Sequence, residues 1–172
     1  MISIRARSLA VLLAAAPAAA SGQMPNAYGP NVNAETARKV AAAAIAEAKK
    51  NGWTMAVAVV DTSGTLVHFE RVDNTQTGSV RVAQEKARTA AQFKRPTKAF
   101  EDAIAGGRQA VLGIPGATPV EGGVPLLDAG KIVGAVGVSG GMGQQDGQCA
   151  KAGADLLAGS AGGATPVPGA KP

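Results

Sequence analysis

A glycine-rich segment at residues 121–140 limits the fold of this chain more than any other part of the sequence. It reads EGGVPLLDAGKIVGAVGVSG, which is typical of two β-strands joined by a tight turn at Asp-Ala-Gly. Several of its small residues stand where a strand normally carries a bulky side chain. Glycine inside a strand lets a helix, a neighbouring subunit or a ligand approach the backbone closely. We therefore expect this segment to be a platform for one of these three.

Residues 1–20 have the features of a secretory signal peptide. Arg5 and Arg7 precede an apolar stretch at 9–16, and an A-x-A cleavage site follows at 18–20. The apolar stretch is too short to span a bilayer by itself. The sequence therefore predicts a secreted protein, periplasmic or extracellular, with no membrane attachment once the leader is removed.

The composition argues against several classes of function. Loss of Arg5 and Arg7 leaves 15 of the 17 basic residues against 12 acidic ones, and aromatic residues make up 3% of the chain. Nucleic-acid-binding proteins carry clustered basic patches, often with aromatic stacking platforms, so nucleic acid is not an expected partner. Cys149 is the single cysteine, which excludes an intrachain disulfide, and the haem attachment motif C-x-x-C-H is absent. We expect Cys149 to be buried in a helix.

Segments rich in proline and glycine flank one predicted domain at 33–158. Residues 21–32 are expected to form a flexible arm and residues 159–172 a disordered tail. Hydrophobic periodicity predicts helices at 34–50, 79–93, 97–104 and 144–157, and strands at 54–60, at 65–71 and within 121–140. The order α-β-β-α-α-β-β-α with tight hairpin turns favours an α+β fold, in which helices flank an antiparallel sheet.

Familiar catalytic motifs are absent or incomplete. Residues 137–141 match the G-x-S-x-G pattern around Ser139, but the only histidine, His68, precedes the serine in the chain, whereas a nucleophile elbow requires a later one. This order argues against a serine hydrolase. Phosphate-binding and dinucleotide-binding glycine motifs are missing. One histidine and one cysteine also argue against a transition-metal site closed by protein ligands alone.

Two side chains have both a functional and an ordinary interpretation. Lys86 belongs to a basic run at 86–98 but lies off the alanine face of its helix, where its stem would be buried and its ammonium held. A lysine held in this way suits a carboxylate ligand or a partner chain. The ordinary interpretation of the basic run is a helix flank exposed to solvent. His68 has the chemistry of a haem iron ligand or a proton shuttle, or it is a half-exposed strand histidine with a hydrogen-bond partner.

Motifs in a fixed order carry a resemblance to a known family. They are EKARTAA at 85–91, RPT at 95–97, EGGVP at 121–125 and GAVGVSG at 134–140, followed by Asp146. Over about residues 32–157 the chain resembles the haem-binding and haem-degrading domain family. The resemblance implies a profilin-like fold, homo-oligomers and, in some members, noncovalent binding of haem or a related tetrapyrrole. It also implies a set of residues that shape the pocket or the subunit contacts: Lys86, Arg95, Thr97, Glu121, Gly122 and Gly123. His68 lies outside the shared motifs, so iron ligation by it is not carried over.

A tetrapyrrole is a flat apolar ring with carboxylates, which calls for a smooth platform and cations at its edge. We expect Gly134, Ala135 and Gly137 to form that platform and Lys86 and Arg95 to supply the cations. Gly137 and Ser139 are therefore also candidate ligand-binding residues. The leading hypothesis is a secreted haem-binding protein for haem capture, buffering or slow degradation. The alternatives are a binding or accessory protein for a small carboxylated metabolite beside an oxidoreductase, and an oligomeric scaffold without a ligand.

Overall fold

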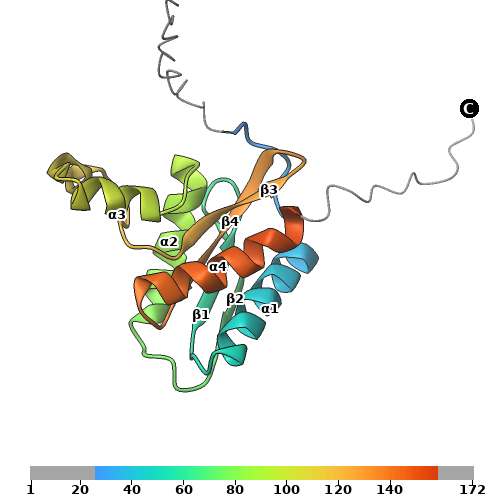
Figure 1. Cartoon of the computed structure of the whole chain (residues 1–172). Helices are drawn as coiled ribbons and strands as arrows, with labels where there is room; N and C mark the ends of the chain where they lie inside the picture. Colours follow the sequence, from blue (N-terminus) through green and yellow to red (C-terminus); the bar gives the residue numbers. More distant parts are fainter. Residues whose placement is uncertain (1–25, 159–172) are drawn as a thin grey trace, which may run out of the picture.

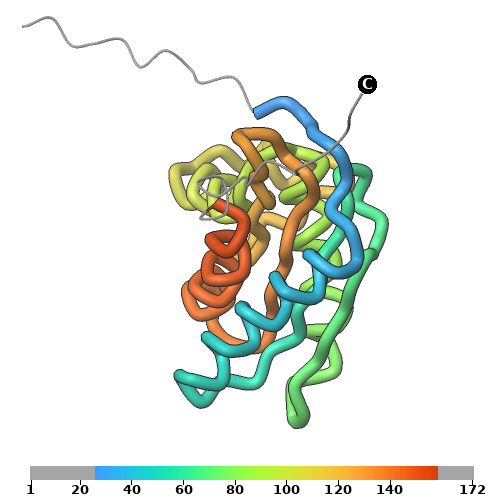
Figure 2. The backbone as a smooth tube through the Cα atoms, turned by 90° about the vertical axis from the view of Figure 1, so that its right-hand side faces the viewer, coloured from blue at the N-terminus to red at the C-terminus, as the bar shows by residue number. Residues whose placement is uncertain are grey.

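The computed structural model describes residues 26–158, and a four-stranded antiparallel sheet forms its centre (Figures 1 and 2). The strands stand in the order β2-β1-β4-β3, so β2 and β3 are the two edges. Each edge strand is joined to its neighbour by a hairpin. The bounds are β1 (Ala56–Val60), β2 (Leu66–Arg71), β3 (Gly123–Asp128) and β4 (Lys131–Ser139).

Helices cover both faces of this sheet. α1 (Ala34–Lys50) and α4 (Gly143–Ala158) lie side by side on one face, and α2 (Ser79–Phe93) crosses the other (Figure 1). Because side chains alternate along a strand, Val57, Val59, Val136 and Val138 enter the core under α1 and α4. The intervening positions are small and pack against the alanine face of α2; they are Ala56, Ala58, Val60 and Ala135.

A short helical pair connects α2 to β3. α3 (Lys98–Ala105) and the 3₁₀-helix η1 (Gln109–Gly113) pack against each other and project from the side of the sheet (Figure 1). Thr97 directly precedes α3, but its side chain does not cap the helix, and its backbone is already helical, with φ −63° and ψ −24°. Its hydroxyl instead accepts a hydrogen bond from the Gly123 N–H at 2.9 Å.

The predicted element order and α+β class are confirmed. The helices predicted at 34–50 and 79–93 have these bounds in the structure, and Asn33 caps α1 by accepting a 2.8 Å hydrogen bond from the Thr36 N–H. Cys149 is buried, as expected, and burial raises the pKa of its thiol to about 11. Among the residues that the structure describes, no helix is long and apolar enough to cross a bilayer.

The sequence predicted a flexible arm at 21–32, but the described part of this segment is held to the sheet by backbone hydrogen bonds. Past the end of β1, the segment 27–32 runs along β4. The Gly29 N–H donates to the Ile132 carbonyl at 2.8 Å, and the Val32 N–H donates to the Val133 carbonyl at 2.7 Å. A single isolated bridge leaves no alternating pattern in a sequence, which is why periodicity did not reveal it. The predicted leader at 1–20 and the predicted tail at 159–172 lie outside the described residues.

The glycine platform holds helix α2. A Cβ atom added at Gly137 would lie 2.1 Å from the Ala83 carbonyl oxygen and 2.4 Å from the Ala87 nitrogen. One added at Gly123 would lie 2.3 Å from the Lys86 carbonyl oxygen. Both contacts are far too short for real atoms, so the helix backbone rests directly on these strands. The expectation that Gly134, Ala135 and Gly137 form a bare floor for a ligand is therefore wrong, because the chain's own elements cover it.

Replacing Gly137 by alanine should push α2 away from the sheet. We expect Gly137→Ala to lower the free energy of unfolding by about 1–3 kcal/mol, as overpacking of a tight interface does. Urea denaturation followed by circular dichroism measures this. Gly113→Ala is the matched control, because a Cβ there meets no atom within 4 Å, and it should leave stability nearly unchanged. Equal stability of the two variants would contradict the close packing of α2.

Candidate binding cleft at the β3 edge

A cleft of about 350 Å³ opens beside the edge strand β3, between α4 and the start of α3. Its walls are mainly apolar. The lining residues come from separate parts of the chain and are Pro96, Lys98, Glu121, Gly122, Gly123, Val124, Gly147, Lys151, Ala154 and Asp155. The volume lies in the lower part of the range for small-molecule sites, roughly 300–1,000 Å³. Of the residues singled out from the sequence, Glu121, Gly122 and Gly123 line this cleft.

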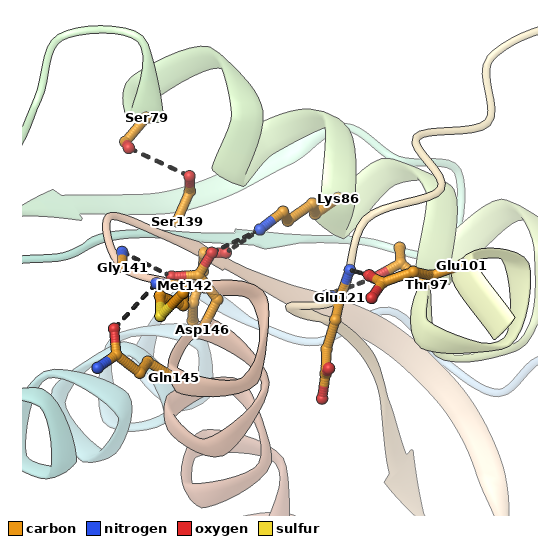
Figure 3. A network of polar contacts seen from close by, with 12 residues as sticks. Ser79, Lys86, Thr97, Glu101, Glu121, Ser139, Gly141, Met142, Gln145 and Asp146 are labelled. Carbon is orange, nitrogen blue, oxygen red and sulfur yellow. Dashed lines mark hydrogen bonds and ion pairs between the residues drawn. The ribbon is translucent and has the colours of Figure 1, made fainter. Parts of the chain in front are cut away.

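Lys86 is buried but is not free to meet a ligand. Its ammonium lies 2.7 Å from the Asp146 carboxylate and also donates to the Val138 carbonyl at 3.2 Å (Figure 3). Only 1% of the Lys86 side chain is exposed. The burial predicted from the helix pattern is confirmed. The interpretation of Lys86 as a rim cation for a ligand carboxylate is wrong, because a partner 60 residues away in sequence already occupies the ammonium.

Asp146 completes this buried network from the first turn of α4. Its second carboxylate oxygen accepts a hydrogen bond from the Gly141 N–H at 3.0 Å. Burial raises the pKa of Asp146, while the Lys86 ammonium and the backbone N–H groups of Gly141 and Gly140 act in the opposite direction. The pair thus joins α2, the end of β4 and α4 at one point directly behind the cleft. A Cβ atom at Gly122 would lie 2.9 Å from the Lys86 nitrogen, so a wall residue of the cleft touches the pair.

Thr97 positions the floor of the cleft from behind. Its N–H donates to the Gly123 carbonyl at 3.0 Å, and its hydroxyl accepts from the Gly123 N–H at 2.9 Å. Both backbone groups of Gly123 are thereby fixed where β3 begins. Thr97 is fully buried and does not line the cleft, so its role in the site is positional.

Arg95 does not line the cleft either. Its Nε donates to the Phe93 carbonyl at 3.1 Å, and its guanidinium lies 5.7 Å from the centre of the Phe100 ring. The cations at the cleft are instead Lys98 and Lys151. Sequence reasoning included Lys98 in the basic run and did not single out Lys151. The sequence offered one signal for this side of the cleft: Gly147 is a glycine inside a helix, which indicates that another group packs closely against α4 there.

Ser139 and His68 lie away from the cleft. The Ser139 hydroxyl is buried 3.1 Å from the Ser79 hydroxyl, beneath α2 (Figure 3). His68 is on β2, the opposite edge of the sheet, and three strand spacings of about 4.8 Å separate it from β3. Its Nε2 atom is buried without a hydrogen-bond partner among the described residues, 4.0 Å from the Glu70 carboxylate. Within one chain, the sheet order therefore keeps His68 out of a site formed by the residues at 121–123.

Glu121 supplies the cleft with a carboxylate. Its N–H donates to the Glu101 carboxylate at 2.6 Å, and its side chain lies across Gly147, where a Cβ atom would come within 2.4 Å of Oε1. Figure 3 shows the carboxylate directed away from the Lys86–Asp146 pair. Burial raises the pKa of Glu121; Lys98 opposes this shift, and Glu101 and Asp102 add to it.

The two lysines at the cleft already have anionic neighbours. Lys98 pairs with Asp102, and Lys151 pairs with Asp155, each one helical turn away. All four side chains are at least 43% exposed. Exposed pairs of this spacing contribute little to stability, so a ligand carboxylate can compete for either lysine at small cost.

The comparisons with known proteins agree with this architecture. The family model described as "Haem degrading protein HbpS-like" matches residues 32–155. The chain belongs to this family. Protein GlcG of Escherichia coli is 44% identical over 105 residues, which cover 61% of this chain and 78% of GlcG.

Solved structures have the same fold. A double mutant of HbpS from Streptomyces reticuli superimposes with a TM-score of 0.69 at 36% identity, covering 84% of this chain and 98% of that one. A structure named as the PduOC:Heme complex gives a TM-score of 0.66 at 24% identity, covering 74% and 95%. At that identity the PduOC likeness supports the fold alone.

Removing one partner of the buried ion pair should destabilise the protein strongly. We expect Lys86→Met to lower the free energy of unfolding by roughly 3–5 kcal/mol, because it leaves the Asp146 carboxylate buried and uncompensated. Adding Asp146→Asn removes that charge and retains an acceptor for the Gly141 N–H, so the double variant should be more stable than Lys86→Met alone. Urea denaturation of both variants measures the difference.

The control for this pair is Lys39→Met, which breaks the exposed Lys39–Glu35 pair on α1 and should change stability little. The structural role of the buried pair would be refuted if Lys39→Met lowered the free energy of unfolding as much as Lys86→Met. It would also be refuted if the double variant were no more stable than Lys86→Met alone.

Proposed function

We propose that the protein binds haem noncovalently in the cleft beside β3, as a secreted protein for haem capture, buffering or slow degradation. The observation that carries this proposal is the apolar cleft at residues 121–124, in a chain of the HbpS-like family. Homo-oligomers belong to the same proposal, as does a periplasmic or extracellular location.

The residues of the cleft fit a tetrapyrrole in type. Val124, Ala154 and Pro96 offer apolar contacts to the ring, and Gly147 on α4 leaves room beside them, where an added Cβ atom would meet the Glu121 side chain. Lys98 and Lys151 stand where they can pair with propionate groups. A haem is larger than the cleft, so it would bind with one edge in solvent or against a second subunit. When bound, the haem supplies the redox chemistry of its iron, and the protein holds the ring and orients its propionates.

A small carboxylated metabolite is the second candidate. The same two lysines favour it, since each can exchange its neighbouring aspartate for a ligand carboxylate. The mainly apolar walls favour the larger ring, because a small polar anion gains nothing from contact with Val124 or Ala154. Absorbance separates the two candidates, as a metabolite complex is colourless.

A haem titration with cleft-filling variants tests the proposal. We expect wild type to shift the Soret band of haem at micromolar protein. Gly147→Leu should weaken binding at least tenfold, because its side chain enters the cleft, where the nearest atoms to an added Cβ belong to the end of the Glu121 side chain. The matched control is Gln144→Leu, an exposed residue of α4 that does not line the cleft.

Unfolding by urea checks that both variants remain folded. A free-haem spectrum with wild type would overturn haem binding. Equal affinities of wild type and Gly147→Leu would overturn the location in the cleft.

A further inference from the structure

Some of the charged side chains around the cleft have ion-pair partners, and one does not. Both lysines are paired with aspartates on their own helices. The Glu121 carboxylate makes no hydrogen bond or ion pair with any described residue, although its side chain is partly buried against Gly147. Burial raises the pKa of Glu121, but its carboxylate oxygens are not fully withdrawn from water. The cleft thus presents one carboxylate without a hydrogen-bond or ion-pair partner among the described residues, and that group is an acceptor.

The backbone around Glu121 is held in place by several independent contacts. The Glu101 carboxylate accepts a hydrogen bond from the Glu121 N–H. Gly122 follows with a left-handed φ of +129°, and the Thr97 hydroxyl accepts a hydrogen bond from the Gly123 N–H. Only glycine tolerates the Gly122 conformation and its contact with the Val138 carbonyl oxygen, 2.6 Å from an added Cβ. These contacts fix the main chain, so the Glu121 side chain starts from a defined point at the cleft wall.

An acceptor in an apolar cleft is complementary to a cation, a metal centre or a hydrogen-bond donor. It repels the carboxylates of a ligand, and Asp155 adds negative charge at the same cleft. Propionates are therefore best placed at the exposed lysines, with the centre of the ring toward Glu121. A ferric porphyrin carries positive charge at its centre, whereas a metal-free ring and a small carboxylate do not.

We propose that Glu121 is the residue that contacts the metal centre of the bound tetrapyrrole, so that the cleft selects a ring carrying a trivalent metal over the metal-free ring. This inference rests on the proposed function, and it names the ligand class and the selecting residue of the same site. His68, on the opposite edge of the sheet, takes no part in it.

The test compares three rings that share the same periphery: ferric protoporphyrin IX, gallium(III) protoporphyrin IX and metal-free protoporphyrin IX. Wild type should bind the two metallated rings more tightly than the metal-free ring. Glu121→Gln should weaken both metallated rings by roughly tenfold or more, the loss expected for a charge-assisted contact, and should leave the metal-free ring within about twofold. It should also move the Soret band of the ferric complex.

Two further variants separate contact from folding. Glu121→Asp retains the charge and should keep part of the preference for metallated rings. His68→Ala should leave all three affinities and the Soret band unchanged. Urea denaturation checks that Glu121→Gln is folded, which is expected because the Glu121 N–H and Gly122 remain.

The outcomes distinguish the inference from the proposed function. If wild type binds all three rings equally and Glu121→Gln changes none of them, the inference is overturned and haem binding stands. If His68→Ala, and not Glu121→Gln, moves the Soret band, the inference is also overturned. If wild type binds no ring, the proposed function itself fails. A preference for metallated rings that disappears in Glu121→Gln supports the inference.

Discussion

The buried ion pair between Lys86 and Asp146 holds the functional end of this domain together. Burying two charges is costly, and further hydrogen bonds offset this cost here: Lys86 also donates to the Val138 carbonyl, and Asp146 also accepts from the Gly141 N–H. The pair joins α2 on one face of the sheet to α4 on the other, around the end of β4. The position of α4, and with it one wall of the cleft, depends on this contact.

The glycines of the hairpin serve the same purpose. Gly123 and Gly137 let the backbone of α2 rest on β3 and β4, which brings Lys86 within reach of Asp146. A side chain at either glycine would move the helix and pull the ammonium from its partner. Because the platform is covered, the proposed ligand site lies at the β3 edge, where Thr97 fixes the first residue of the strand.

The chemistry of the cleft follows from which charges are already satisfied. Lys86 is paired inside the protein with Asp146, and Lys98 and Lys151 form exposed pairs with aspartates. The Glu121 carboxylate has no hydrogen-bond or ion-pair partner within residues 26–158. The proposed site for a flat ring with a charged centre and anionic edges rests on the apolar walls, the exposed lysines and the Glu121 carboxylate. Membership of the HbpS-like family and the HbpS structure are consistent with a haem of this kind.

Local sequence patterns were enough to predict the elements: the helices at 34–50 and 79–93, the hairpins, the small-residue platform and the motif at 121–123. These features depend on hydrophobic periodicity, turn residues and the positions of glycine, all of which can be read from neighbouring residues in the sequence. The packing of the elements in space shows which helix covers the platform and which charged side chains form pairs. The Lys86–Asp146 pair, the contact of Glu121 with Gly147 and the separation of His68 from the cleft join residues distant in sequence. Spacing carries no signal for such contacts, because they arise from how α2, α4 and the sheet edges pack in space.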